Sequence, residues 1–179
     1  SAGAVPGPVC YKRGGTAPTV TDANLALGYL DPAYFNDGAI SLDKETARES
    51  IRREIGKPLN LSTEDAAWGI HLIATNNMEH AIRIVLVERG RDPRRYTMVA
   101  FGGAGPLHAC RLARKIGVPQ VIIPRNAGVG SAVGLLGADA RLDASTTRIM
   151  RLDATDGKTL RNLYDDLEKR VQTDLEKLA

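Results

Sequence analysis

Cysteine, aromatic residues and long apolar runs are scarce in this sequence, and each shortage excludes a class of protein. The two cysteines, Cys10 and Cys110, form no Cys-x-x-Cys pair, which argues against a disulfide scaffold and favours a reducing compartment. Aromatic residues make up 4% of the chain, too few for a platform on which nucleic-acid bases stack. No apolar run approaches the roughly 18 residues that cross a bilayer. We therefore expect a cytoplasmic protein without a membrane partner.

An excess of charge of one sign is also lacking. The 24 basic and 21 acidic residues leave a net charge of +3, and the two signs alternate without forming blocks. Because a nucleic-acid footprint requires clustered basic residues, nucleic acid is not an expected partner. A hydrophobic content of 43% over 179 residues is enough to bury one core of ordinary domain size. The loop-like start at Ser1, in place of methionine, suggests a piece of a longer polypeptide.

Histidine is scarce as well, with three in the chain. His71 and His80 are nine residues apart on one predicted helix, so they face opposite sides of it and cannot share a metal ion. The sequence also has no cluster of cysteine and histidine. A zinc site is therefore not expected.

Helical patterns dominate the first half of the sequence. A short helix is expected from Thr21 or Asp22, either of which can serve as its N-cap, with Gly28 limiting its length. Apolar residues at helical spacing predict an amphipathic helix over 42–56 and a long buried helix over 62–89.

Strands alternate with helices in the second half. The β-rich run 96–101 precedes a helix over 106–117, and the short apolar run 120–124 precedes a glycine turn and another helix. Residues 145–151 allow a further strand, and the charged segment 158–179 predicts a terminal helix. This alternation indicates the α/β class.

Four small residues, Gly102, Gly103, Ala104 and Gly105, stand between the first of these strands and its helix. A dinucleotide-binding Gly-x-Gly-x-x-Gly motif starting at Gly103 would need a third glycine where His108 stands, and no P-loop motif occurs. Two interpretations remain. The strand-to-helix turn is too tight for side chains, or the adenosine of a nucleotide lies on bare backbone, with helix N–H groups nearby for its phosphates.

Several polar side chains are candidates for a site. Asp22, Thr21 and Asn24 supply the oxygen ligands that a divalent metal carried by ATP requires, although a helix N-cap explains Asp22 equally well. His108, at the start of a helix, either contacts a phosphate or caps and packs that helix. Ser131 lacks the Gly-x-Ser-x-Gly context of a hydrolase nucleophile and is expected to cap a helix.

Four stretches resemble the hydantoinase/oxoprolinase family in their order and spacing: SAGAVPGPVCY, TVTDANLALGYL, AFGGAGPLHA and VIIPRNAGVGSAVGLLGAD. The resemblance runs from Ser1 to about Asp143, in particular to A-type (beta-like) chains of the ATP-dependent N-methylhydantoinase kind. It implies a fragment of an actin-like ATPase domain with an RNase H-like fold, a mixed sheet and packed helices. Residues 1–143 would be the latter half of that domain, and residues 144–179 a linker strand and a terminal helix.

This resemblance also implies a function. Gly102, Gly103, Ala104, Gly105 and His108 would contact ATP, and Asp22 would act in catalysis and, with Thr21 and Asn24, hold Mg²⁺. Because resonance stabilises the amide C–N bond, ATP would drive opening of a small cyclic amide, such as a hydantoin or 5-oxoproline, by phosphorylating the amide oxygen. Two alternatives stay open: ketone carboxylation by the same family, and a non-catalytic subunit-interaction module.

The partners implied by the resemblance are protein segments and a small substrate. The phosphate-gripping hairpin and acidic residues of the first half of the domain would precede Ser1, in the remaining part of the same polypeptide. A B-type (alpha-like) hydantoinase subunit would be a second partner. The isolated piece is therefore expected to lack ATP-coupled turnover, since positioning dominates phosphoryl transfer.

Overall fold

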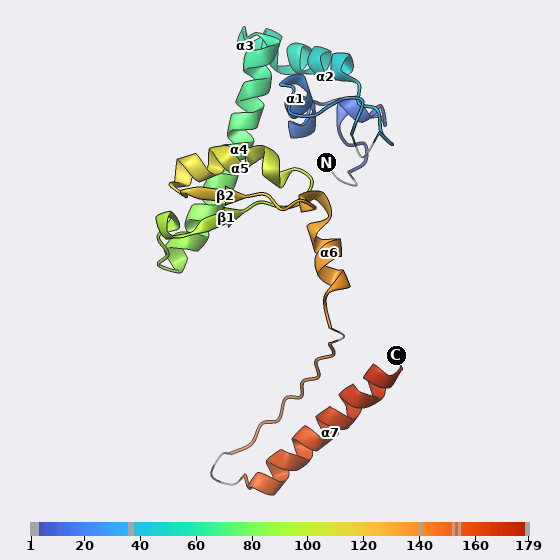
Figure 1. Cartoon of the computed structure of the whole chain (residues 1–179), viewed down its shortest axis with the longest axis vertical. Coiled ribbons are helices and arrows are strands. Elements are labelled where there is room, and N and C mark those ends of the chain that lie inside the picture. The colour runs from blue at the N-terminus through green and yellow to red at the C-terminus, as the bar shows by residue number, and fades with distance from the viewer. Residues whose placement is uncertain (1–3, 36–37, 140, 152, 154, 178–179) are drawn as a thin grey trace. The chain divides into compact units, whose positions relative to one another are not determined.

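The computed structural model describes residues 4–35, 38–139, 141–151, 153 and 155–177. The chain divides into two compact units, Ser1–Gly130 and Ser131–Ala179. Helices α1 to α5 and a small parallel sheet belong to the first unit, and helix α7 belongs to the second (Figure 1). The structure is thus of mixed α/β type, with one sheet of two parallel strands in the described residues.

A capping box begins helix α1 (Val20–Ala26). Thr19 is the N-cap: its hydroxyl oxygen accepts a hydrogen bond from the Asp22 N–H at 3.4 Å, and the Asp22 carboxylate accepts one from the Thr19 N–H at 2.8 Å. The expected N-cap at Thr21 or Asp22 is therefore wrong. The helix starts earlier because this reciprocal pair places Asp22 at the third helical position, where its carboxylate satisfies the backbone of the N-cap residue.

The carboxylate of Asp22 also anchors the segment that precedes α1. It is fully buried and accepts hydrogen bonds from the N–H groups of Val9 at 3.2 Å and Cys10 at 2.8 Å, which lie in the short helix η1 (Val9–Tyr11). A further hydrogen bond comes from the Thr19 hydroxyl at 2.8 Å. One side chain thus joins η1 to the start of α1.

Helix α2 (Lys44–Ile51) continues through the π-helical turn η2 (Arg52–Gly56) into α3 (Lys57–Leu59). The amphipathic helix expected over 42–56 is confirmed, but it does not end at Gly56. The Gly56 carbonyl instead accepts a hydrogen bond from the Leu61 N–H at 2.8 Å, and a side chain there would lie 3.1 Å from the Leu61 carbonyl oxygen. Glycine permits this close approach, and the left-handed residue Asn60 ends the helix.

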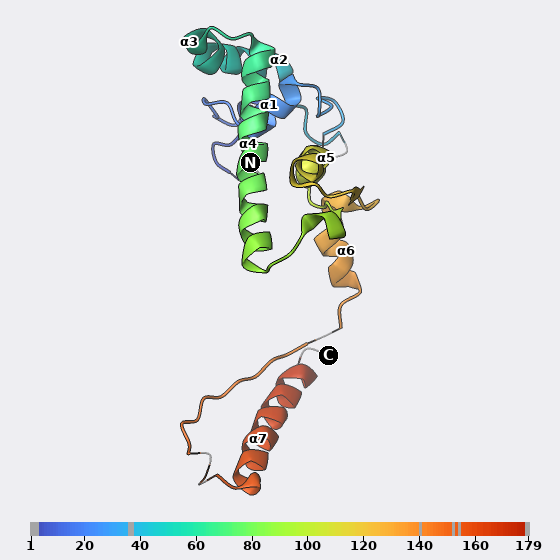
Figure 2. The same ribbon diagram turned by 90° about the vertical axis from the view of Figure 1, so that its left-hand side faces the viewer.

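The long helix α4 (Thr63–Glu88) confirms the helix expected over 62–89, with Ser62 as its N-cap. The expected burial is wrong for its second half, where Ile84, Val85 and Val87 are exposed. Its first turns pack against α1 and α2 (Figures 1 and 2). The shared core contains Ala23, Ala26, Ile51, Ala66 and Ala67. A second cluster, formed by Cys10, Leu25, Leu42 and Ala47, fills the other side of α1. Alanines dominate the first cluster, so the helix backbones approach closely there.

A strand–helix–strand unit packs beside α4. Strands β1 (Thr97–Val99) and β2 (Gln120–Ile122) pair in parallel, with Met98 opposite Val121, and α5 (Gly105–Ile116) connects them. Helix α5 lies across α4 and also contacts β2 (Figures 1 and 2). Its side chains Ala109, Leu112, Ala113 and Ile116 are buried, and Gly117 in the left-handed conformation ends it.

Two expectations for the last part of the chain are wrong. Ser131 lies inside α6 (Gly130–Leu136) and does not cap it, because the helix already begins at Gly130 after the turn η4 (Ala127–Val129). Residues 145–151 form no strand, and the described residues offer no neighbouring strand to pair with them.

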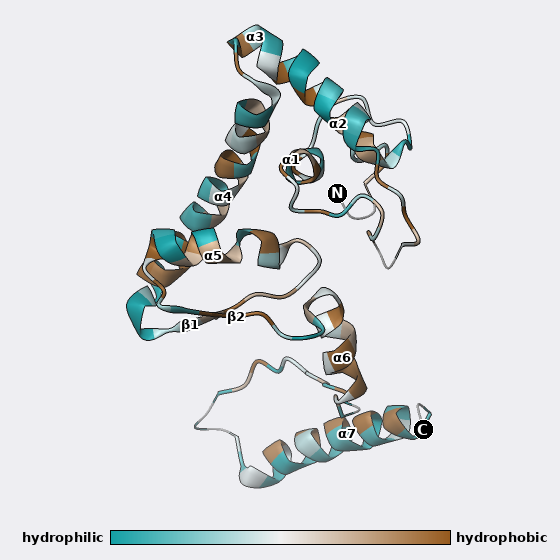
Figure 3. Ribbon diagram, turned by 45° about the horizontal axis from the view of Figure 1, so that its top comes forward, coloured by the Kyte–Doolittle hydropathy of each residue, from teal (hydrophilic) through white to brown (hydrophobic). Residues whose placement is uncertain are grey.

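Helix α7 (Gly157–Glu176) confirms the predicted terminal helix and begins at the N-cap Asp156. Apolar and polar residues alternate along its ribbon (Figure 3), and none of its described residues is buried. No helix among the described residues combines the length and apolar character needed to cross a membrane.

The contacts of Asp22 predict a large effect of a small substitution. Asp22→Asn places an amide NH₂ where the carboxylate accepts hydrogen bonds from backbone N–H groups, so donors face donors. We expect the free energy of unfolding, measured by urea denaturation of the chain, to fall by about 2–4 kcal/mol. Asp65→Asn, at the same helical position of α4 but exposed, is the matched control and should cost less than about 1 kcal/mol. Equal losses in the two variants would contradict the anchoring role.

Candidate functional site

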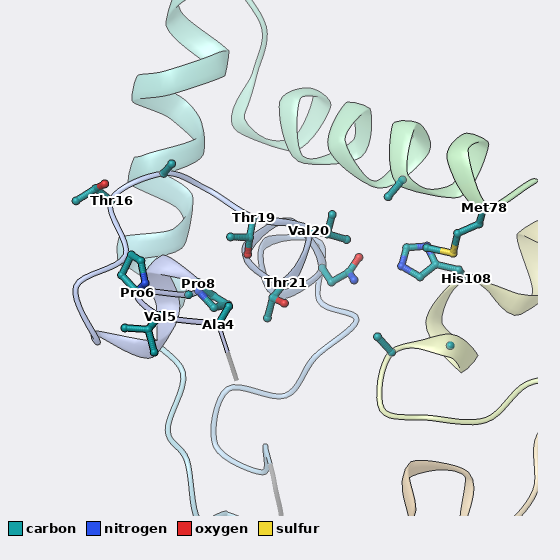
Figure 4. Close-up of a pocket in the computed structure, with 16 residues that line it drawn as sticks. Ala4, Val5, Pro6, Pro8, Thr16, Thr19, Val20, Thr21, Met78 and His108 are labelled. Atoms are coloured by element: carbon teal, nitrogen blue, oxygen red, sulfur yellow. The ribbon is translucent and has the colours of Figure 1, made fainter. Parts of the chain in front are cut away.

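A cleft of about 680 Å³ lies within the first unit, between α1, the start of α5 and one face of α4. Its lining is mostly apolar, with a few polar groups from α1 and α5, as small-molecule sites usually are. In Figure 4 the His108 ring extends from α5 toward α1, next to Met78 of α4. The opposite wall is formed by the N-terminal segment, including Ala4, Val5, Pro6 and Pro8.

Two stretches that the sequence singled out meet in this cleft. Its lining includes Thr21 and Asn24 from α1, and Ala104, Gly105 and His108 from the glycine turn and α5. The stretches lie far apart in the sequence, and the packing of α1 and α5 on the same helix α4 brings them together. The other predicted site residues, Asp22, Gly102 and Gly103, are not among those that line the cleft.

In the glycine turn, the backbone conformation requires glycine at Gly102 but not at Gly103 or Gly105. Gly102 adopts a φ of 89°, which favours glycine, and its N–H donates to the Ala127 carbonyl oxygen at 2.6 Å. Gly103 and Gly105 have no such φ, and a Cβ at either would meet no described atom within 4 Å. The tight turn therefore explains Gly102 alone. Open space remains over the backbone at Gly103 and Gly105.

The predicted metal ligands Asp22, Thr21 and Asn24 do not form a common oxygen cluster. The Asp22 carboxylate is occupied by η1 and Thr19, and the Asn24 side-chain oxygen accepts a hydrogen bond from His71. Nowhere in the described part of the chain do three or more His, Cys, Asp or Glu side chains gather as a metal site needs. As arranged here, these three residues do not form a direct Mg²⁺ site. A metal-binding role and a catalytic role for Asp22 remain predictions.

The Cys10 thiol lies beside Asp22 and is also structural. Burial, with the Asp22 carboxylate beside it, raises the pKa of the Cys10 thiol far above its ordinary value. A neutral buried thiol is a poor nucleophile. Cys110 is exposed, and both cysteines are free.

A stack of rings behind the cleft was missed by the sequence analysis. The imidazoles of His71 on α4 and His108 on α5 stack with centroids 4.4 Å apart and an interplanar angle of 14°. The Trp68 ring also stacks with the His71 ring, with centroids 5.5 Å apart, and the Arg111 guanidinium lies 4.3 Å from the centroid of the Trp68 ring. The stack joins α4 to α5 directly.

Two hydrogen bonds fix the histidine pair. His71 Nδ1 lies 2.8 Å from Asn24 Oδ1, and His108 Nδ1 lies 3.1 Å from the Thr75 hydroxyl oxygen. Desolvation lowers the pKa of both imidazoles, and neighbouring His108 and Arg111 lower that of His71 further. Both rings are therefore neutral near pH 7. A neutral His108 does not offer the charge that the predicted phosphate contact would use.

One sequence signal could have found this pair. His71, Thr75 and Met78 follow one another at helical spacing, so they share the face of α4 that α5 covers. His80, the other histidine of α4, lies on the opposite side of the helix. The third partner, His108, comes from a different helix, and spacing along α4 carries no information about it.

The comparisons with known proteins support the sequence resemblance. A sequence model described as hydantoinase/oxoprolinase matches residues 1–144. The alpha subunit of caprolactamase from Pseudomonas jessenii is 45% identical over 98% of this chain, and 5-oxoprolinase 1 from Arabidopsis thaliana is 37% identical over 80%. The gamma subunit of acetophenone carboxylase from Aromatoleum aromaticum is 43% identical over 75%.

Solved structures are similar over nearly the whole chain. Nucleotide-free acetone carboxylase, studied for ATP-dependent acetone carboxylation, gives a TM-score of 0.77 at 31% identity, covering 94% of this chain and 25% of that one. The ATP-dependent caprolactamase of Pseudomonas jessenii gives 0.70 at 45% identity, covering 98% and 26%. The chain also spans 25%, 18% and 13% of caprolactamase alpha, the acetophenone carboxylase subunit and the oxoprolinase. It therefore corresponds to about a quarter or less of these relatives.

The histidine pair predicts how stability depends on pH. Because the folded-state pKa of each ring is lowered, the unfolded chain binds more protons below about pH 6.5, so stability is lost as pH falls through that value. Each ring adds up to about 1.4 kcal/mol per pH unit to this slope. In His108→Asn, the free energy of unfolding measured by urea denaturation should therefore fall less steeply as the pH is lowered from 6.5 to 5. An unchanged slope in His108→Asn would count against the buried pair.

Proposed function

Because the chain belongs to the hydantoinase/oxoprolinase family, we propose that it is part of an ATP-dependent cyclic amide hydrolase and contributes the adenosine-contacting side of its nucleotide site. The observation that carries this proposal is the open backbone at Gly103 and Gly105, which the turn itself does not require. A flat nucleoside can lie there without displacing a side chain. The larger fold would be an actin-like ATPase domain, of which this chain is the latter half.

The start of α5 suits a phosphorylated ligand. Its N-cap, Ala104, provides no side-chain hydrogen bond, so the first N–H groups of the helix have no side-chain acceptor there. Pro106, in the first turn, lacks an N–H and disturbs nothing. A helix N-terminus also carries a partial positive charge. The proposal thus places the nucleotide along the turn, with its phosphates toward this helix end.

ATP would serve to activate an unreactive bond. Resonance makes amides poor electrophiles, and transfer of the γ-phosphoryl group to the amide oxygen would make the carbonyl carbon a better electrophile for water. After water adds, the ring nitrogen would take a proton and leave as the amine, and a second water would release phosphate from the resulting acyl phosphate. Such a reaction is mainly a matter of positioning the two substrates. The cleft between α1 and α5 contributes one wall of that arrangement, and ATP would bring Mg²⁺ with it.

The rest of the site would come from other protein segments. The chain covers about a quarter of caprolactamase alpha, and the sheet edge carries exposed apolar side chains: Val99, Phe101, Ile122 and Ile123. Exposed apolar groups gathered in this way are typical of a surface that another segment covers. We infer that the remaining polypeptide covers it, and that a B-type subunit completes the enzyme, as the subunit names of several relatives suggest.

Ketone carboxylation is the second candidate, favoured by the similarity to acetone carboxylase. It predicts ATP consumption that depends on a ketone and bicarbonate, whereas the hydrolase predicts dependence on a lactam, hydantoin or 5-oxoproline. Assays of ADP release by the full-length protein with each substrate separate the two. A non-catalytic module would bind no adenine nucleotide at all.

A valine at the glycine turn tests the nucleotide proposal. Since Gly103 has an ordinary φ and open space around it, Gly103→Val should leave the melting temperature of the full-length protein nearly unchanged. The new side chain would occupy space used by adenosine, and we expect the Kd for ATP, measured by calorimetry, to rise about 5- to 100-fold.

The control for this variant is Gly69→Ala. Gly69 lies in α4 with similar open space, so the added methyl group should leave ATP affinity unchanged. If Gly103→Val folds and binds ATP like the parent, adenosine does not lie on this turn. If it fails to fold, Gly103→Ala provides the smaller step.

A further inference from the structure

Two almost fully buried side chains present unused polar atoms to the cleft. Asn24 is 2% exposed and His108 is 1% exposed, and both line the cleft. The Asn24 amide nitrogen and His108 Nε2 have no hydrogen-bond partner in the residues that the structure describes. Every fully enclosed side-chain nitrogen or oxygen among those residues does have a partner. The two unused atoms are therefore reached from the cleft.

The hydrogen-bond direction at Thr75 determines the character of His108 Nε2. The Thr75 hydroxyl donates its single hydrogen to the His71 carbonyl oxygen at 2.8 Å, as hydroxyls in helices commonly do. Its oxygen must then accept from His108 Nδ1, 3.1 Å away. A neutral imidazole that carries its proton on Nδ1 has a lone pair on Nε2. His108 thus offers the cleft an acceptor.

The same reasoning makes Asn24 a donor toward the cleft. Its side-chain oxygen is used by His71 Nδ1 at 2.8 Å, so His71 Nδ1 carries the proton of that hydrogen bond. The amide NH₂ group of Asn24 remains, and it can only donate. An acceptor from α5 and a donor from α1 therefore stand in one cleft, each held in its orientation by a hydrogen bond to α4.

We propose that Asn24 and His108 recognise a planar ligand edge on which an N–H donor stands beside an acceptor atom. A small cyclic amide has this edge, because its ring holds the N–H and the C=O on the same side. The amide N–H would donate to His108 Nε2, and the Asn24 NH₂ would donate to the carbonyl oxygen. This inference rests on the proposed function and adds to it the group that selects the substrate.

The adenine base offers the same chemistry, with its exocyclic NH₂ beside a ring nitrogen. A lactam and the adenine base can be distinguished by removing the N–H donor from each in turn and measuring which ligand then binds less tightly. For a lactam, N-methylation removes the N–H. For the nucleotide, N6,N6-dimethylation of ATP removes the exocyclic N–H donors. Both ligand pairs can be titrated into the full-length protein by calorimetry, with turnover prevented by omitting the second substrate.

The first test uses His108→Asn and His108→Gln. Asparagine keeps a donor near Nδ1 but has no atom at the Nε2 position, whereas the glutamine oxygen reaches that position. We expect the parent to bind the lactam at least about tenfold more tightly than its N-methyl analogue. His108→Asn should abolish this ratio, and His108→Gln should keep part of it. If adenine is the ligand, the ratio between ATP and N6,N6-dimethyl-ATP changes in the same way.

Thr75 provides a second test that does not alter a residue in contact with the ligand. Thr75→Val removes the oxygen that holds the Nδ1 proton of His108, so Nε2 is no longer kept as the acceptor. The affinity ratio should fall toward one, and Thr75→Ser should restore it. A purely structural role of Thr75 would weaken both members of a ligand pair equally and leave their ratio unchanged. Thermal melts establish which variants are folded.

The proposal is overturned if neither ligand pair shows discrimination in the parent, or if both ratios persist in folded His108→Asn and Thr75→Val. Its failure is distinguishable from failure of the proposed function. Loss of ATP affinity in Gly103→Val with no effect of His108→Asn on any ratio would keep the nucleotide site and remove the amide-recognising pair. The reverse result would keep the pair and remove adenosine from the turn.

Discussion

The arrangement of the cleft depends on two buried hydrogen bonds that meet on α4. One joins Asn24 of α1 to His71, and the other joins Thr75 to His108 of α5. Buried polar groups are costly when unpaired, so each bond penalises any displacement of the helix it holds. The stacked imidazoles lie between them and exclude water. Helices α1 and α5 are far apart in the sequence, and this shared attachment gives the cleft two walls with a defined relation.

Asp22 extends this constraint to the third wall. Its carboxylate holds the N–H groups of Val9 and Cys10, and the residues just before them, Pro6 and Pro8 among them, line the cleft opposite α5. Asp22, the candidate catalytic residue of the sequence, thus has a clear positioning role. Its ionised carboxylate has two acceptor oxygens and no donor, so it can accept hydrogen bonds from the N–H groups of Val9, Cys10 and Thr19 at once. The polar groups that do face the cleft are neutral, as suits an uncharged substrate edge or base.

Much of the local structure followed from the sequence, because it depends on neighbours along the chain. The long helix α4, helix α5 with its final Gly117, and the helix over Lys44–Ile51 were all predicted by apolar spacing and end signals. The family resemblance was also confirmed by the match over residues 1–144. It could be recognised from the sequence because four ordered stretches carry more information than one glycine motif. The sequence could not show which glycines of the turn are required by a tight backbone and which leave space for a ligand. Only the backbone angles distinguish Gly102 from Gly103 and Gly105.

What could not be predicted depends on contacts between elements. The pairing of His71 with His108 requires α5 to cross α4 at one particular turn, which no spacing within either helix specifies. Thr19 was not predicted as the N-cap, because Asp22 is itself a good N-cap residue type. The backbone groups of η1 that the Asp22 carboxylate binds lie about a dozen residues earlier in the sequence, so local patterns do not reveal them. The segment 145–151 has strand-like residues, yet a strand needs a partner, and the described residues provide none there.

A crystal structure of the full-length protein with a lactam and a non-hydrolysable ATP analogue tests this interpretation of the cleft most directly. We predict ligand density between α1 and α5, with adenosine over Gly103 and Gly105. A planar donor–acceptor edge should lie about 3 Å from both the Asn24 amide nitrogen and His108 Nε2. Density for both ligands elsewhere, with the cleft filled by another segment of the polypeptide, would contradict it.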